Sequence, residues 1–221
     1  MSDSKTPSVD AAYALETPED NVALYKSWAK TYDDDFVDRT HYQQFKTISD
    51  AVLAQRDRLK GPVLDVGCGT GVVGIYLRDA GINDIDGIDI SQEMLDVAAT
   101  KTSSNGDSAY RNLIQADLTQ TIDIADNRYG AILSAGTFTH GHLGPEALNE
   151  LWRVAAPGAM ISIAVRSTHY ESDGFAAKLD QDAMDDVIRD LELTEINVYA
   201  DDAPNHSHAA DTAMMVVCRV T

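Results

Sequence analysis

The chain is poor in cysteine, in basic residues and in long apolar runs, and each of these scarcities argues against a class of protein or partner. It holds only two cysteines, Cys68 and Cys218, without the spacing of a metal site, so we expect neither a disulfide framework nor a metal centre. Lysine and arginine number 17 against 36 aspartates and glutamates, which gives a formal net charge of −19. That deficit argues against nucleic acid or an anionic membrane as a partner, because both attract positive charge.

Long apolar runs are also lacking. None reaches the length that a membrane-spanning helix needs. Residues 1–17 are polar and acidic, without the apolar segment of a signal peptide, so we expect a flexible N-terminus and a cytoplasmic protein. With 44% hydrophobic residues, the 221-residue chain is long enough for one compact domain, which we expect to be a monomer or a homodimer.

Hydrophobic periodicity divides the rest of the chain into a helical cover over residues 18–60 and an α/β core over residues 61–221. Apolar side chains recur at helical spacing from the Thr17-Pro18 cap to Tyr32, and again over residues 42–60. We then predict strands at 62–67, 84–90, 111–118, 129–136, 159–166, 194–200 and 213–220, and helices at 71–81, 91–101, 144–158 and 176–191. This alternation predicts a doubly wound, Rossmann-like sheet of seven strands with an antiparallel C-terminal strand.

A glycine loop follows the first predicted strand, in "VLDVGCGTGVVG". From Gly67 it contains G-x-G-x-G, the loop of enzymes that bind S-adenosylmethionine (SAM), and from Gly69 it contains G-x-G-x-x-G, the dinucleotide fingerprint. The second motif begins late, and its last glycine, Gly74, fits a close packing contact of the helix better. Asp65, just before the loop, would repel a pyrophosphate and suits an ammonium group. The loop therefore favours SAM over a nicotinamide cofactor.

Two further acidic residues end the next two strands. Asp89 is placed to accept hydrogen bonds from two ribose hydroxyls, and Asp117 to accept one from the exocyclic amine of adenine. Each also has an ordinary explanation, since acids commonly cap strand ends and turns. The sequence offers no residue pair suited to hydride transfer. Its one Tyr-x-x-x-Lys pattern, at Tyr42 and Lys46, lies upstream of the glycine loop.

The successive segments "VLDVGCGTGVVG", "GIDISQEML", "ADL", "YGAILSAGTFTHGH" and "LWRVAAPGAMISIAVR" resemble the motifs of the class I SAM-dependent methyltransferases. Residues 28–33 and the stretch "GTFTHGHLGPEAL" are similar to bacterial relatives of the methyltransferase-like protein of the Williams–Beuren region. The resemblance covers residues 20–165 well and the remainder loosely. Its motifs are specific for the superfamily and weak for the methyl acceptor.

The resemblance implies a set of SAM contacts, with the first helix closing over the cofactor through its aromatic residues. The implied contacts are Trp28, Tyr32, Asp65, Gly67, Cys68, Gly69, Asp89, Ile90, Met94, Asp117, Leu118 and Ser134. Core packing is the alternative for the two aromatic residues, and we interpret the acidic run 33–35 as a solvated helix end. Residues 134–137 depart from the Asn/Asp-Pro-Pro-aromatic motif of amide-directed enzymes, which disfavours DNA or protein amides as acceptors.

Residues that contact the methyl acceptor are harder to assign from the sequence than those that contact SAM. His140 and His142 follow the fourth strand, where either is placed to act as a general base or to order a loop. Two histidines without a third ligand do not make a metal site. The residues expected near the acceptor are Thr137, Arg166, His169 and Tyr170, and Arg166 is a candidate partner for a substrate carboxylate.

The sequence thus predicts a SAM-dependent methyltransferase that acts on a small molecule by in-line displacement. Three alternatives stay open: a protein or RNA methyltransferase, a SAM-binding module without turnover, and a nicotinamide oxidoreductase. Net acidity disfavours RNA. Oxygen, nitrogen, sulfur and carbon acceptors fit the sequence equally.

Overall fold

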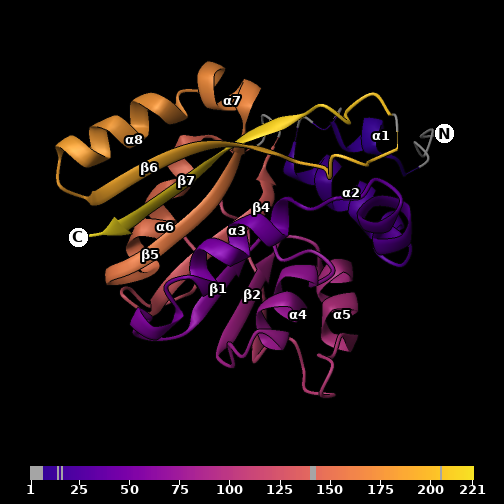
Figure 1. The fold of residues 1–221 in the computed structure, drawn as a ribbon, viewed down its shortest axis with the longest axis horizontal. Helices are drawn as coiled ribbons and strands as arrows, with labels where there is room; N and C mark the ends of the chain where they lie inside the picture. The colour runs from indigo at the N-terminus through magenta and orange to yellow at the C-terminus, as the bar shows by residue number, and fades with distance from the viewer. Residues whose placement is uncertain (1–6, 14, 16, 140–142, 205) are drawn as a thin grey trace.

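The structure, a computed structural model, describes residues 7–13, 15, 17–139, 143–204 and 206–221 (Figure 1). Its centre is a seven-stranded sheet of order β3-β2-β1-β4-β5-β7-β6. The strands are β1 (Val63–Val66), β2 (Ile85–Asp89), β3 (Asn112–Gln115), β4 (Tyr129–Phe138), β5 (Ala155–Arg166), β6 (Ile188–Asn197) and β7 (Thr212–Val220). The first five strands pair in parallel and β7 runs antiparallel to both neighbours. The predicted doubly wound sheet with an antiparallel last strand is confirmed.

Helices cover both faces of this sheet (Figure 1). One face packs against α3 (Gln44–Leu53), α4 (Val72–Asp79) and α5 (Gln92–Thr100), and the other against α6 (Leu148–Val154) and α8 (Phe175–Met184). Alternate residues of β1 serve the two layers, since Val63 packs on the α3 side and Leu64 on the α6 side. Burial on both faces explains why the central strands read as continuous apolar runs.

The N-terminal cover consists of α1 (Val9–Tyr13), α2 (Pro18–Trp28) and the π-helix η1 (Asp33–Asp38) (Figure 1), and α2 packs against α5. The hydroxyl of Thr17 accepts the backbone N–H of Asp20 at 3.1 Å, as the cap signature predicts. The helix α2 ends at Trp28, before the predicted Tyr32, and the π-helix η1 follows it. π-Helical turns are rare and occur often at functional sites.

Two other helix predictions were too long. Instead of one helix over residues 42–60, α3 ends at Leu53 and a short 3-10 helix, η2, spans Arg56–Arg58. Instead of a helix over residues 144–158, the 3-10 helix η3 (Pro145–Ala147) and α6 end at Val154, and β5 begins at Ala155, paired with Tyr129 of β4. Strand pairing overrides the helical propensity of the alanines there.

The largest error lies before the last strand. A helix was predicted to residue 191 and a strand over 194–200, whereas α8 ends at Met184 and β6 starts at Ile188. Asp186, with a φ of 60°, takes the left-handed conformation that ends a helix. Because β6 is an edge strand with mostly exposed residues, its sequence is polar and lacks the alternation that reveals buried strands.

Candidate active site

A cleft opens at the carboxyl ends of the central strands, beneath the N-terminal cover. It encloses about 1480 Å³ of empty space, counting the part open to solvent. Its lining comes from the glycine loop, the segments after β2 and β3, the cover, the end of β4 and the segments around β5–β7. Ligands of open α/β sheets bind at this edge, beside the point where the strand order reverses.

The glycine loop forms the floor of the cleft. Gly67 has a φ of 66°, and a Cβ there would lie 2.0 Å from Oγ1 of Thr137, so only glycine fits. Gly69 has a φ of 51°, and a Cβ there would meet nothing within 4 Å. Because Gly69 lines the cleft, its bare Cα leaves a cradle in which a ligand can approach the backbone. Gly74 packs against the ring of Tyr110, as the sequence analysis predicts.

Asp65 lies behind this loop and is absent from the residues that line the cleft. It is 1% exposed, and its Oδ2 accepts the hydroxyl of Tyr110 at 2.6 Å. Its Oδ1 is buried without a hydrogen-bond partner in the part of the chain that the structure describes. Burial raises the pKa of this carboxyl to about 7. An ammonium group can reach Asp65 only through an intermediary such as water.

Asp89 and Asp117 do line the cleft. The oxygens of Asp89 accept the N–H of Ser91 at 2.8 Å and the N–H of Gly69 at 2.9 Å, and burial raises the pKa of this carboxyl. Each oxygen has a second acceptor site for a ribose hydroxyl. Asp117 accepts both the N–H and the hydroxyl of Thr119 at 2.8 Å, so its turn role and its place in the cleft coexist. Together with the Gly69 cradle, these acceptors fit SAM.

Further residues from the predicted SAM set also line the cleft: Trp28, Tyr32, Cys68, Ile90, Met94 and Leu118. Burial raises the pKa of the Cys68 thiol well above its usual value, so this thiol stays protonated and is no nucleophile. Ser134, in contrast, is fully buried away from the cleft and donates to the carbonyl of Val66 at 2.8 Å. Its hydroxyl therefore supports the start of the glycine loop from behind.

Rings from the cover, from the start of α3 and from the segment between β6 and β7 give the cleft an aromatic wall. We define this wall as Tyr25, Trp28, Tyr32, Phe36, Tyr42, Phe45 and Tyr199. Ring centroids of Trp28 and Tyr32, and of Tyr32 and Phe36, are 5.0 Å apart. Burial raises the pKa values of Tyr25, Tyr32 and Tyr42. These phenols stay protonated near neutral pH, so they can donate hydrogen bonds but cannot act as bases.

Sequence reasoning missed a tether between the cover and the glycine loop. Asp33 accepts the hydroxyl of Thr70 at 2.5 Å and forms an ion pair with Lys101 after α5. The acidic run 33–35 was interpreted as a solvated helix end, and for Asp33 this was wrong. Thr70 and Lys101 lie far along the chain from Asp33, so no local pattern reveals the contact.

On the acceptor side, the structure brings Thr137 and Arg166 to the cleft. A register shift between β4 and β5 after Ser134 turns the end of β4 into the cleft, and the Thr137 hydroxyl donates to the carbonyl of Val66 at 2.9 Å. His169 and Tyr170 lie instead in α7 (Ser167–Ser172) and are absent from the lining. Tyr170 is buried in the core beside α8, since the chain continues as a helix after β5. His140 and His142 lie outside the described residues.

Gln44 is a second residue that the sequence did not reveal. It lines the cleft at the first turn of α3 and is 1% exposed. Its Oε1 accepts the Tyr42 hydroxyl at 3.2 Å, while its Nε2 has no hydrogen-bond partner among the described residues. The indole N–H of Trp28 is in the same situation. Buried donors without partners are rare in proteins, and both residues line the cleft.

Two findings about the described part of the chain concern membrane spans and metal sites. No helix in it has the length and apolarity to cross a bilayer. No group of three or more His, Cys, Asp or Glu residues within it is placed to hold a metal ion.

Residues 63–158 match the family model described as a methyltransferase domain, and this segment holds the glycine loop, Asp89 and Asp117. This segment is a methyltransferase domain, and the findings support a class I SAM-dependent methyltransferase. Magnesium protoporphyrin IX methyltransferase from Synechocystis PCC 6803, solved with bound SAM, shares the fold of this chain with a TM-score of 0.64. At 19% identity, the match covers 94% of this chain and 99% of that one.

Two curated relatives add sequence similarity. Human methyltransferase-like protein 27 is 28% identical over 165 residues, which are 72% of this chain and 63% of the human protein. The malonyl-[acyl-carrier protein] O-methyltransferase of Pectobacterium atrosepticum is 31% identical over 119 residues, 54% of this chain and 42% of the relative. The chain thus spans less than two thirds of the length of either relative.

Proposed function

We propose that this protein transfers the methyl group of SAM to a small-molecule acceptor bound in the cleft. The observation that carries the proposal is the shared cleft itself, which is lined by Asp89, by the Gly69 cradle and by the aromatic wall. A cleft that combines polar acceptors with aromatic rings suits a nucleoside-containing cofactor beside a second small molecule. The name of the Pectobacterium relative, an O-methyltransferase, supports the same reaction class.

The residues that line the cleft would divide the cofactor contacts among them. Asp89 would hold the ribose, Asp117 and the segment at Leu118 the adenine, and the backbone of Gly67 and Gly69 the methionine portion. Ile90 and Met94 would pack against the base. Bound SAM supplies a methyl group on a sulfonium, and the protein's share of the work is alignment and exclusion of water.

The aromatic wall would perform that exclusion. The Asp33 tether fixes the cover to the glycine loop, so the wall and the cradle keep a constant spacing. Because the phenols of the wall stay protonated, they can orient an acceptor atom but not remove its proton. We retain His140 and His142 as the predicted base for acceptors that need one.

Calorimetric titration with SAM, S-adenosylhomocysteine and NADH tests the cofactor. Binding of the two adenosyl ligands and no binding of NADH is the expected result, and NADH binding alone would refute the proposal. Methyl transfer is then measured as S-adenosylhomocysteine release over a panel of small acids, phenols, thiols and amines. If the adenosyl ligands bind but none of the panel is turned over, a protein acceptor or a module without turnover becomes the better account.

A further inference from the structure

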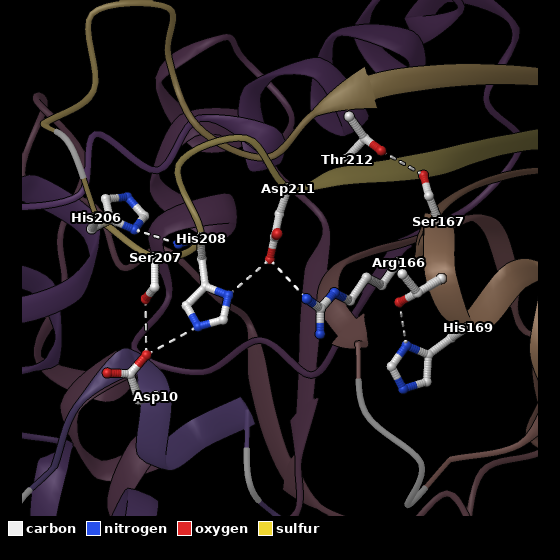
Figure 2. A network of polar contacts seen from close by, with 10 residues as sticks. Asp10, Arg166, Ser167, His169, His206, Ser207, His208, Asp211 and Thr212 are labelled. Carbon is white, nitrogen blue, oxygen red and sulfur yellow. Dashed lines mark hydrogen bonds and ion pairs between the residues drawn. The ribbon is translucent and has the colours of Figure 1, made fainter.

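One cation faces the cleft. Among the described lining residues, Arg166 is the only lysine, arginine or histidine. It ends β5, beside the end of β4, where Phe138 pairs with Val165. Its guanidinium Nη2 donates to Oδ2 of Asp211 at 3.0 Å (Figure 2). A chain with a net charge of −19 thus places a positive group in the lining of the cleft.

Asp211 is shared with a histidine. The same Oδ2 lies 3.2 Å from Nδ1 of His208, and Nε2 of that ring lies 3.1 Å from Oδ1 of Asp10 in α1 (Figure 2). Ser207 also donates to Asp10, at 2.9 Å. The carboxylate of Asp211 thus contacts both Arg166 and His208. The same contacts tie α1 to the segment before β7.

Gln44 lies close to this group along the backbone. Its N–H donates to the carbonyl of Val198 at 3.1 Å, and the N–H of Val198 donates to the carbonyl of Asp211 at 3.1 Å. Gln44, whose Nε2 has no hydrogen-bond partner among the described residues, and Arg166 therefore line the cleft from adjoining segments. Both side chains carry N–H donors, so a ligand that binds them must present oxygen acceptors.

We propose that Arg166 and Gln44 together bind a carboxylate of the methyl acceptor, an apolar acid whose body packs on the aromatic wall, and that Asp211 and His208 are positioning residues for Arg166. The proposal rests on the proposed function, because the acid shares the cleft with the methyl donor. Asp211 already places one negative charge beside the guanidinium. A monoanion adds one more, whereas a phosphate dianion would add two and leave more buried charge uncompensated.

The test uses the whole protein saturated with S-adenosylhomocysteine, titrated with 3-phenylpropionate and octanoate and with their neutral amides. Both acids are expected to bind at least about tenfold more tightly than the amides, because a hydrogen bond to a charged group is stronger than a neutral one. Arg166→Gln should lower acid affinity to the level of the amide, and Arg166→Lys should restore part of it. Gln44→Met should weaken acid binding about fivefold.

His208→Gln tests the positioning role. Without the imidazole, Asp211 pairs with Arg166 alone, so acid affinity should fall about threefold while amide affinity stays constant. A merely structural loss would weaken acid and amide alike. Ser49→Ala is the matched control for Gln44: Ser49 is a buried residue of α3 whose hydroxyl has no described partner, and it is absent from the cleft lining. Arg189→Gln, at an exposed position, controls for net charge.

Equal binding of acids and amides to the wild type, including no binding of either, would overturn the inference. So would an equal loss of acid affinity in Ser49→Ala and Gln44→Met. The two proposals fail differently. Absence of S-adenosylhomocysteine binding sinks the proposed function, whereas tight S-adenosylhomocysteine binding without preference for acids sinks only the carboxylate site.

Discussion

Replacing Gly69 with alanine separates the two demands that the glycine loop meets, a left-handed backbone and an open surface. Gly69 has a φ of 51° and lines the cleft, and a Cβ there would meet no protein atom within 4 Å. The folded protein therefore has room for the methyl group. Its cost to folding is the left-handed strain alone, about 1–2 kcal/mol.

Ligand binding should suffer separately, because the methyl group would occupy the cradle. An added methyl in a fitted site costs about 1–3 kcal/mol, which is roughly a 5- to 150-fold rise in Kd for S-adenosylhomocysteine. Gly81→Ala is the matched control. Gly81 has a φ of 94°, an equally open surrounding and a place outside the cleft lining.

Urea unfolding and calorimetry measure the two effects on both variants. The free energies of unfolding should fall by similar amounts, and only Gly69→Ala should bind S-adenosylhomocysteine more weakly. Wild-type affinity in Gly69→Ala would refute the assignment of the cradle to the cofactor. A parallel loss of affinity in Gly81→Ala would show that strain, and not occupation of the cradle, reduces binding.

Three further predictions concern carboxylates. Asp89→Ala should raise the Kd for S-adenosylhomocysteine by at least about 100-fold, because two hydrogen bonds to a charged group are lost; unchanged affinity in calorimetry would contradict the ribose assignment. Asp33→Asn should speed S-adenosylhomocysteine dissociation by about three- to tenfold in stopped-flow experiments by loosening the cover, whereas the exposed neighbour Asp34→Asn should not; equal rates in the two variants would argue against the tether. The pKa of Asp65, raised to about 7 by burial, means that the folded state holds this proton more tightly than the unfolded state. Stability should therefore be greatest below about pH 4 and fall as pH rises towards 7, by at most about 4 kcal/mol from this group. Asp65→Asn should flatten that slope in unfolding experiments from pH 4 to 8, and an unchanged slope would assign the pH dependence to other groups.

The parts of the molecule that the sequence predicted correctly depend on local patterns. Buried strands at 63–66 and 85–89 alternate with helices. The glycines of the loop lie close together in the sequence, so their motif is visible over a few consecutive residues. Asp89 was identifiable because it ends a strand next to that loop. Such features need only a few consecutive residues, so periodicity and turn chemistry expose them.

The features that the sequence did not predict depend on contacts between distant segments. Asp33 meets Thr70 and Lys101, and Gln44 gains its meaning only where α3 docks beside the cleft. Gln44 occupies one polar position beside an apolar helix face, which is common on any surface helix. The predicted strand at 194–200 failed for a related reason: pairing with β7, rather than the edge strand's own polar sequence, determines where β6 begins.

The two tryptophans are intrinsic fluorophores in different surroundings, one beside the cleft and one away from it. Trp28 is buried in the aromatic wall, and its indole N–H has no hydrogen-bond partner among the described residues. Trp152 lies in the core on the other face of the sheet and donates to Asp182 at 2.8 Å. A ligand entering the cleft changes the surroundings of only the first indole. In a Trp152→Phe background, intrinsic emission therefore becomes a label-free readout of cleft occupancy, suited to screening acceptors before any turnover assay exists.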